Sequence, residues 1–356
     1  MHPFSTPTNK LNSHSEPVGK SATRTAIVPA DCAIIIVAWN CWPYIFKCLD
    51  ALQTQTVTGF RIVIVDNGDA DPAQFEHASR YANVTYIKSP RNLGFAAGNN
   101  LGINAATNAK WIFLLNPDTE AAPTWFEKMI NAAQHYPYFS VFGCTLLMAS
   151  AQEKLDGEGD CYSISGFAWR SGMGLLAQHK HARPREVFSP CAAAALYKAD
   201  VLRHVGGFDE DFFCYMEDSD LGFRLRLAGY RCLTVSDAEV LHVGSATTGK
   251  RSPFYVYYGQ RNLVWTYVKN MPGVLFWLFL PLHVALNIAG VLRYALSGQF
   301  KVVWRAKHDA VKALPKMWQK RRKIQKTRRA SITEILKALD KRPVPGLGRA
   351  MSTLWK

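Results

Sequence analysis

Three carboxylates lie within four residues at Glu217-Asp218-Ser219-Asp220. The helix macrodipole favours acids at the start of a helix, and this explains Asp220 well. It explains Glu217 and Asp218 less well, because neighbouring carboxylates repel one another. Like charges and desolvation raise the pKa of a carboxyl group toward neutrality, so this cluster is suited to general-base chemistry.

Polar loops follow four apolar runs in the first third of the chain. They are Trp39-Asn40, Asp66-Asn67-Gly68, Arg91–Asn100 and Asn116-Pro117-Asp118. Taken singly, each has a structural explanation, since Asn and Gly suit turns and Asn-Pro-Asp suits a helix start. Polar loops after every one of four successive runs are better explained by a ligand site along one edge of a sheet.

The runs that precede these loops predict buried strands. They are rich in β-branched residues and lie at Ala33–Ala38, Arg61–Val65, Val84–Lys88 and Trp111–Leu115, with helix-like stretches between them. This alternation indicates βαβ units and a mostly parallel sheet covered on both faces. Ligands of such sheets bind at the carboxyl ends of the strands, where the polar loops lie.

The rest of the chain gives weaker patterns. Its composition predicts a helix over Thr119–Tyr136, a strand over Ala192–Tyr197, helices over Asp218–Gly229 and Tyr255–Asn270, and an irregular excursion over 150–190. Residues 1–29 are expected to form a disordered leader, and the first 25 of them contain no apolar segment typical of a secretory signal. None of the eight cysteines is in a C-x-x-C pair, which argues against a zinc knuckle or dithiol motif.

The charge of the chain is concentrated near its end. The whole sequence carries a net charge of +15, and the stretch 297–356 holds 17 Lys and Arg against 3 acids. This basic tail directly follows Val274–Leu292, which has 19 residues without Asp, Glu, Lys or Arg. An apolar segment beside a polybasic stretch is the two-signal pattern for attachment to an anionic membrane surface. A buried core helix is the alternative for the apolar segment, and nucleic-acid binding is the disfavoured alternative for the tail.

Seven motifs occur in the order seen in one enzyme family. They are IIIVAWN, VDNG, RNLGFAAGNN, LLNPD, GGFDEDFF, MEDSDLGFRLRLAGY and LHVGS. Over about residues 33–270 the chain resembles the inverting family-two glycosyltransferases, in particular the rhamnosyltransferase-like branch of bacterial surface polysaccharide synthesis. The resemblance implies a GT-A fold, in which a mostly parallel, Rossmann-like nucleotide-binding sheet is fused to an acceptor-binding half. These motifs are specific for the family and not for the sugar.

The resemblance assigns the strand-end loops to the nucleotide-sugar donor. Asp66 corresponds to the acid that holds the nucleotide base, and Asn40 and Asn92 to polar positions that line the nucleotide. Asn116-Pro117-Asp118 corresponds to the metal-binding DXD motif, with Asn116 beside the nucleotide and Asp118 as the metal ligand. Because the first position of the motif is Asn, fewer anionic oxygens are available to the cation, which keeps a catalytically degenerate sugar-nucleotide-binding protein as an alternative.

The resemblance assigns the second half of the site to the chemical step. Asp218 corresponds to the catalytic base, and Glu217 and Asp220 are placed on the acceptor side. His242 corresponds to a histidine that joins the metal or diphosphate site in some members, although a lone His at a strand edge is as readily structural. A Mg²⁺ or Mn²⁺ ion with oxygen ligands would neutralise the leaving diphosphate. One essential carboxylate at the sugar implies inversion.

The sequence therefore predicts three parts: a leader over 1–29, a GT-A glycosyltransferase domain over 30–270, and a membrane-associated apolar segment with a basic helical tail over 271–356. The expected donor is dTDP-L-rhamnose, with a UDP-hexose or UDP-galactofuranose as alternatives. The expected acceptor is a polyprenyl-diphosphate-linked glycan at the cytoplasmic face of the inner membrane, and the expected attachment is peripheral or monotopic. A single crossing would separate the basic tail from the catalytic body, so we expect an in-plane or re-entrant helix pair broken at Pro281.

Overall fold

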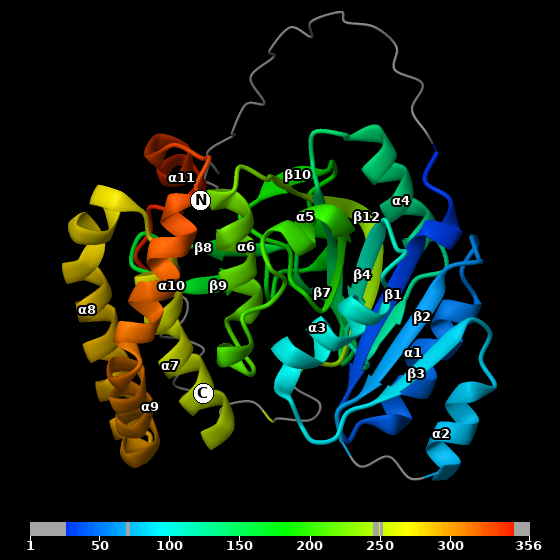
Figure 1. Cartoon of the computed structure of the whole chain (residues 1–356), viewed down its shortest axis with the longest axis horizontal. Coiled ribbons are helices and arrows are strands. Elements are labelled where there is room, and N and C mark those ends of the chain that lie inside the picture. Colours follow the sequence, from blue (N-terminus) through cyan, green and yellow to red (C-terminus); the bar gives the residue numbers. More distant parts are fainter. Residues whose placement is uncertain (1–25, 69–71, 245–248, 250–251, 345–356) are drawn as a thin grey trace, which may run out of the picture.

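A ten-stranded mixed sheet organises the residues that the computed structural model describes, which are 26–68, 72–244, 249 and 252–344 (Figure 1). Most of the predicted leader lies outside these residues, as does the end of the basic tail. Along the sheet the strands follow the order β10-β12-β6-β11-β4-β1-β2-β3, with β5 paired to β12 and β7 paired to β6.

One half of this sheet is parallel, as the apolar runs predict. It consists of β1 (Cys32–Ala38), β2 (Arg61–Asp66), β3 (Val84–Lys88) and β4 (Trp111–Leu115), connected through α1 (Trp42–Gln53), α2 (Pro72–Ser79) and α3 (Gly94–Ala105). Every residue of β1 is buried, and its side chains alternate between a core that includes α1 and a core that includes α3. Gly102 lets α3 approach closely, because a Cβ there would lie 2.4 Å from Cγ2 of Ile35.

The other half of the sheet is mostly antiparallel and departs from the expected pattern. Its strands are β5 (Thr119–Ala121), β6 (Val141–Met148), β7 (Ala151–Gly157), β10 (Arg185–Val187), β11 (Ala194–Lys198) and β12 (Cys232–His242). β11 runs antiparallel to both β4 and β6, and it joins the two halves. The helix predicted over Thr119–Tyr136 is in fact β5 followed by α4 (Trp125–His135), because Pro123 separates the two elements.

The stretch 150–190, expected to be irregular, holds several short strands. Besides β7 and β10 it contains β8 (Asp160–Tyr162) and β9 (Ala168–Arg170), which pair as a separate two-stranded sheet. These strands have three residues each and are separated by Gly166 with φ of 87°. Strands this short contain too few residues to display the period of two by which strands are recognised.

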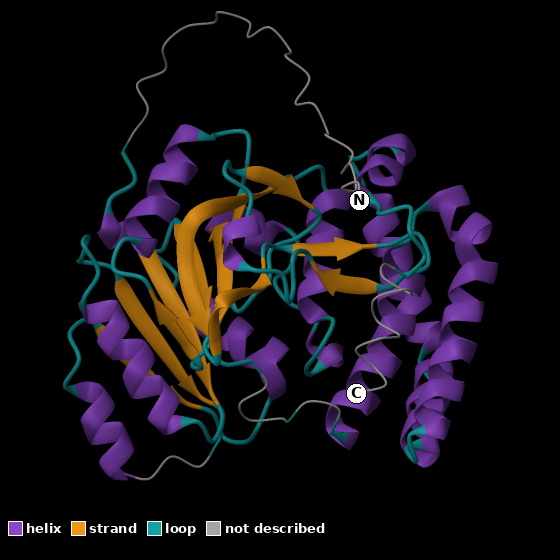
Figure 2. Ribbon diagram, turned by 180° about the vertical axis from the view of Figure 1, so that it is seen from behind, coloured by secondary structure: helices purple, strands orange, loops and turns teal. Residues whose placement is uncertain are grey.

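Helices dominate the second half of the chain, where they form a layer beside the sheet (Figure 2). They are α5 (Ala199–His204), α6 (Glu217–Leu227), α7 (Pro253–Asn270), α8 (Gly273–Leu296), α9 (Phe300–Lys312), α10 (Leu314–Lys326) and α11 (Ile332–Ala338), with short 3-10 helices at Pro29–Asp31 (η1), Ala177–His179 (η2) and Glu210–Phe212 (η3). The expected break at Pro281 is wrong, because α8 continues through this residue as one helix.

A third hydrophobic core connects the helical layer to the rest of the protein. Phe212 and Phe223 from the region before residue 270 pack in one cluster with Phe276, Met317 and Ile335 from the region after it. The boundary proposed near residue 270 stays a prediction, but a shared core crosses it.

A buried ion network strengthens the same junction. The ammonium group of Lys269 on α7 is 1% exposed and contacts the carboxylates of Asp209 and Asp220. Asp220 also accepts from Arg224 Nε at 2.8 Å and from Asn270 Nδ2 at 2.7 Å. Burial lowers the pKa of Lys269 below its ordinary value, although both carboxylates oppose this shift.

We predict that Lys269→Met lowers the free energy of unfolding by about 3 kcal/mol, because it removes the buried cation shared by Asp209 and Asp220 and leaves each carboxylate with one cation fewer. The control is Lys316→Met, which removes an ion pair to Asp211 from a lysine whose side chain is 58% exposed and should cost less than about 1 kcal/mol. Urea unfolding of both variants measures the difference. Equal losses for the two variants would contradict a stabilising role for the network.

Candidate active site

Six of the nine residues that the sequence singled out line one pocket. The pocket lies beside the carboxyl ends of β1, β2 and β4 and the start of α6, and the six residues are Asn92, Asn116, Asp118, Glu217, Asp218 and His242. Asn40 and Asp66 are not among its lining residues, although their neighbours Trp39 and Asn67 are. The structure thus brings together segments that are up to 150 residues apart in the chain.

The strand-end loops form one wall of the pocket through mutual hydrogen bonds. The amide of Asn67 donates to Asn92 Oδ1 at 3.1 Å, and this same oxygen accepts from the N–H of Gly94 at 2.8 Å. Asp66 is buried at the end of β2, where its carboxylate accepts from the Tyr86 hydroxyl at 2.6 Å and from the N–H of Gly68 at 3.0 Å. Asn40 is exposed in the left-handed region, with φ of 49°.

Strand pairing places Asp118 beside His242. β5 begins directly after Asp118 and runs antiparallel to the end of β12, with Thr119 opposite His242. As a result, His242 Nε2 lies 3.4 Å from Asp118 Oδ1, and His242 Nδ1 lies 2.7 Å from Asp156 Oδ2. Burial by itself lowers the pKa of His242, but the two aspartates outweigh burial and raise it above its ordinary value.

These side chains offer nitrogen and oxygen ligands to a divalent cation. The His242 imidazole and the Asp118 carboxylate face each other on the pocket wall, and the Asp156 carboxylate contacts the other ring nitrogen of His242. A carboxylate on the far nitrogen of a metal-binding histidine fixes its tautomer and orientation. Asp118 and His242 are therefore candidate ligands, and Asp156 is the candidate residue that orients the histidine.

Arg170 on β9 is the cation of the pocket wall. Its guanidinium pairs with the Asp156 carboxylate, and its Nη1 lies 3.5 Å from His242 Nδ1. Although burial alone would lower the pKa of Arg170, the nearby Cys191, Asp156, Asp160 and Asp218 outweigh it and hold the pKa above its ordinary value. Arg170 therefore stays charged and lies between the candidate metal ligands and the acidic start of α6.

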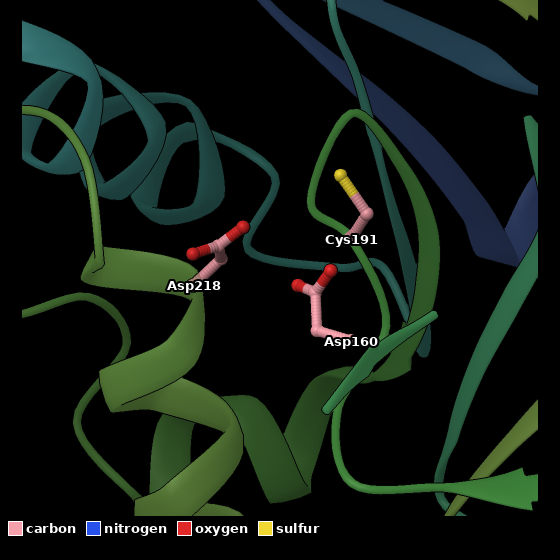
Figure 3. Close-up of side chains that lie close together, drawn as sticks. All are labelled: Asp160, Cys191 and Asp218. Carbon is pink, nitrogen blue, oxygen red and sulfur yellow. The ribbon is translucent and has the colours of Figure 1, made fainter. Parts of the chain in front are cut away.

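Asp218 lines the pocket and lies close to a second carboxylate, that of Asp160 (Figure 3). One oxygen each of Asp218 and Asp160 and the Sγ of Cys191 all lie within 4.8 Å of one another. Burial raises the pKa of Asp218, whereas Arg170 and the N–H of Ser219 act to lower it. Burial and the charge of Asp218 raise the pKa of Asp160 well above its ordinary value, so both carboxyl groups of this pair have raised pKa values.

A strained segment presents the start of α6 to the pocket. Phe213, Tyr215 and Met216 have φ of 66°, 65° and 68°, a region that non-glycine residues rarely occupy. The buried amide of Asn262 on α7 donates to the carbonyls of Phe212, Cys214 and Tyr215 at 2.7 to 2.9 Å. Strain of this kind persists where surrounding contacts hold it in place, and it is frequent at functional sites.

The two other acids of the cluster have different surroundings. Glu217 lines the pocket, and burial followed by the charge of Asp218 raises its pKa well above its ordinary value. Asp220 is fully buried in the ion network with Lys269 and does not line the pocket. The structure therefore separates Asp220 from the acceptor side on which the resemblance placed it.

Sequence reasoning missed four residues of this site: Asp156, Asp160, Arg170 and Cys191. The first three belong to the stretch that was expected to be irregular. A signal was present in Asp156-Gly157-Glu158-Gly159-Asp160, where acids occupy every second position. In an extended segment this spacing places side chains on one face.

Comparisons with known proteins agree with the sequence motifs. A family model described as Glycosyl transferase family 2 matches residues 33–206. The chain is 27% identical over 237 residues to an N-acetylglucosaminyl-diphospho-decaprenol L-rhamnosyltransferase of Mycobacterium tuberculosis, covering 61% of this chain and 77% of that protein. It is 26% identical over 258 residues to the O-antigen biosynthesis protein RfbC of Myxococcus xanthus, covering 67% of this chain but only 20% of that protein.

A solved structure shares the fold. The crystal structure of GalNAc-T7 with UDP, GalNAc and Mn²⁺ superposes with a TM-score of 0.53 at 13% identity, over 66% of this chain and 47% of that one. The expected GT-A fold is thus confirmed, with a mixed sheet and a helical C-terminal part. Because the motifs, the matched family model and the fold agree, we conclude that the chain belongs to glycosyl transferase family 2 and is a glycosyltransferase.

Proposed function

We propose that this enzyme transfers L-rhamnose, with inversion, from dTDP-L-rhamnose to a lipid-linked glycan during synthesis of an O-antigen-like surface polysaccharide. The observation that carries the proposal is the pocket in which Asp118 and His242 face the acidic start of α6. The sugar and the acceptor class rest on the similarity to the rhamnosyltransferase of Mycobacterium tuberculosis, and the O-antigen-like product rests on the similarity to RfbC of Myxococcus xanthus. A UDP-hexose and UDP-galactofuranose remain the alternative donors.

In this proposal Asp218 is the general base. It takes the proton of the acceptor hydroxyl while that oxygen forms a bond to the anomeric carbon and the bond from this carbon to the diphosphate breaks. A base is most effective when its pKa lies near the working pH, and burial moves Asp218 in that direction. Glu217 lies on the acceptor side of the same turn.

The donor is held by the opposite wall in this proposal. Asn92 and Asn116 line the nucleotide diphosphate, Asp66 faces the base, and Asn40 lies at the outer end of the site. Asp118 and His242 would hold a Mg²⁺ or Mn²⁺ ion, which supplies positive charge to the leaving diphosphate when bound. Arg170 adds a permanent positive charge to the same wall.

The lipid-linked acceptor implies a place for the enzyme. A polyprenyl-diphosphate-linked glycan is confined to a membrane, and nucleotide sugars are cytosolic, so we place the enzyme at the cytoplasmic face of the inner membrane. The net charge of the basic tail suits the anionic lipids of that surface and provides the tail with a partner other than nucleic acid.

The first prediction from this proposed function concerns the reaction itself. With dTDP-L-rhamnose and a polyprenyl-diphosphate-linked N-acetylglucosamine, the enzyme should form a rhamnosylated lipid with inverted anomeric configuration, and Asp218→Asn should lower turnover by about 10²–10⁴-fold. Product analysis by mass spectrometry and NMR gives the linkage, and the surface variant Asp237→Asn is the matched control. Transfer from a UDP-sugar but not from dTDP-L-rhamnose would show that the donor is a UDP-sugar. Normal turnover in the Asp218→Asn variant would exclude Asp218 as the base. Binding of the donor without turnover by the unaltered enzyme would favour the degenerate sugar-nucleotide-binding alternative.

The second prediction concerns the cation. A chelator should abolish transfer, and Mg²⁺ or Mn²⁺ should restore it. Asp118→Ala should weaken binding of dTDP in the presence of the cation and change it little in its absence, as measured by calorimetry. Asp156→Asn should raise the cation concentration needed for half-maximal activity by about 10–100-fold, because it frees the orientation of His242. The control is Glu153→Ala, which changes an exposed acid on β7, the strand of Asp156; it should change neither dTDP binding nor the cation concentration needed for half-maximal activity. Full activity in excess chelator would show that Asp118 and His242 are not metal ligands needed for transfer.

The third prediction concerns pH. Asp218 must be ionised to act as a base, so turnover should fall as pH drops through a pKa raised above the ordinary 3.8. Arg170 acts to lower this pKa, and Arg170→Gln should therefore move the acidic limb of the rate profile to higher pH. Arg231→Gln, which breaks a surface pair with Glu186, should leave the limb in place. A limb that stays in place or moves to lower pH in Arg170→Gln would contradict the electrostatic role of Arg170.

A further inference from the structure

The outer face of α8 is apolar over most of its length, and Arg293 in the last turn is the one charged residue of this helix. In the part of the chain that the structure describes, α8 is the one helix long and apolar enough to cross a bilayer. Its outward residues follow a helical spacing and are all exposed: Val274, Trp277, Leu278, Val284, Ile288, Leu292 and Leu296. An apolar stripe of this length at the surface of a protein indicates a binding surface.

The inner face of α8 is fixed to the catalytic body along the same length. Near its start, the carbonyl of Phe276 accepts from the Tyr267 hydroxyl at 2.7 Å. At its middle, the His283 ring stacks on Tyr267 at 4.0 Å, and its Nδ1 lies 2.8 Å from the carbonyl of Ser165. Near its end, Gly290 lies against the side chain of Gln260, where a Cβ would approach within 2.8 Å.

These contacts decide between crossing a bilayer and lying on one. A spanning helix must be surrounded by lipid or by other spanning helices over about 30 Å of hydrocarbon. α8 instead packs one side against α7 and α9 while the opposite side is exposed. A helix with one face on the protein and one apolar face outward can enter a bilayer only from the side.

α9 continues this surface with a different composition. Phe300, Trp304 and Val311 are exposed on it, and Trp304 is 61% exposed. Lys301, Arg305 and Lys312 are exposed beside them. Aromatic side chains bordered by basic ones are typical of a helix that lies at the headgroup level of a membrane. α8 and α9 are neighbours at the edge of the molecule far from β1–β3 (Figure 1).

We propose that α8 and α9 form a monotopic docking surface for an anionic lipid bilayer, with α8 lying in the membrane plane and its outer face in contact with the acyl chains. The inference gives a geometry to the membrane location that we proposed above, and it rests on that proposal for its biological purpose. Anionic headgroups complement the basic border on α9. A two-fold contact between two copies would instead bring this basic border against its own counterpart.

Vesicle binding of the full chain tests the surface. The chain should sediment with vesicles of phosphatidylcholine and phosphatidylglycerol, and less with phosphatidylcholine alone. Leu278→Asp with Ile288→Asp should reduce this binding at least tenfold, since both side chains are exposed and their replacement costs the fold little. Tyr138→Asp, at a residue 82% exposed before β6, is the matched control and should bind as the parent chain does.

Two further measurements separate the alternatives. With vesicle-bound protein, a membrane-impermeant maleimide added outside should label both Tyr138→Cys, on the catalytic body, and Ser297→Cys, directly after α8, because an in-plane helix leaves the chain before and after it on the same side of the bilayer. Labelling of only one of the two positions would show a spanning helix and overturn the proposal. Self-association that the Leu278→Asp/Ile288→Asp variant abolishes, without vesicle binding by the parent, would assign the surface to a second copy and overturn it as well.

The activity of the same variant separates this proposal from the proposed function. Leu278→Asp/Ile288→Asp should keep donor turnover with a short-chain, water-soluble acceptor, since neither residue lines the active-site pocket. Retained turnover with lost vesicle binding supports the docking surface. Absence of turnover in the parent chain, with normal vesicle binding, would count against the proposed donor or acceptor and leave the docking surface standing.

Discussion

The active site depends on placing one arginine among several carboxylates. Asp156, Asp160 and Asp218 gather around one pocket wall, and without a cation their mutual repulsion and burial would oppose folding. Arg170 lies among them, and it is the last residue of β9, a strand of three residues. Its charge acts to lower the pKa of both Asp218 and Asp160, and its contact with Asp156 extends the same network to His242. The candidate base and the candidate metal ligands are therefore electrostatically coupled through this side chain.

The helical layer contributes to the same site. The left-handed residues before α6 are held by hydrogen bonds from the Asn262 side chain of α7. The C-terminal end of α7 is held in turn by Lys269 and its buried ion network. α7 also packs against α8 and α9, the helices of the proposed docking surface. One helix thus touches both the segment that presents Asp218 and the surface that we place on the membrane. A shift of α7 would displace Asp218, which gives the stability of this layer a direct effect on the geometry of the pocket.

Sequence patterns predicted one half of this arrangement better than the other. The apolar runs of β1 to β4 are continuous and long, so burial on both faces and the loops at their ends could be predicted from composition alone. Asp160 and Arg170 lie on strands too short to show a period, and their proximity to Asp218 arises from long-range pairing. Asp220 was misplaced for a local reason. Residues two apart on a helix point in nearly opposite directions, so Asp218 can face the pocket only while Asp220 faces the core.

The same reasoning about helix faces explains why hydropathy alone left the role of α8 open. Mean hydropathy averages over all sides of a helix. The side of a helix that faces protein is instead recognised from a few residues that recur about every seven positions. Phe276, His283 and Gly290 are seven residues apart, and Asn287 falls on the same stripe four residues after His283. Three of these residues make close packing or polar contacts with the catalytic body, and Asn287 accepts a hydrogen bond from Lys307 of α9. Residues seven apart that make close or polar contacts with the protein therefore identify the protein-facing side of an otherwise apolar helix, and the opposite side is the one that we propose faces lipid.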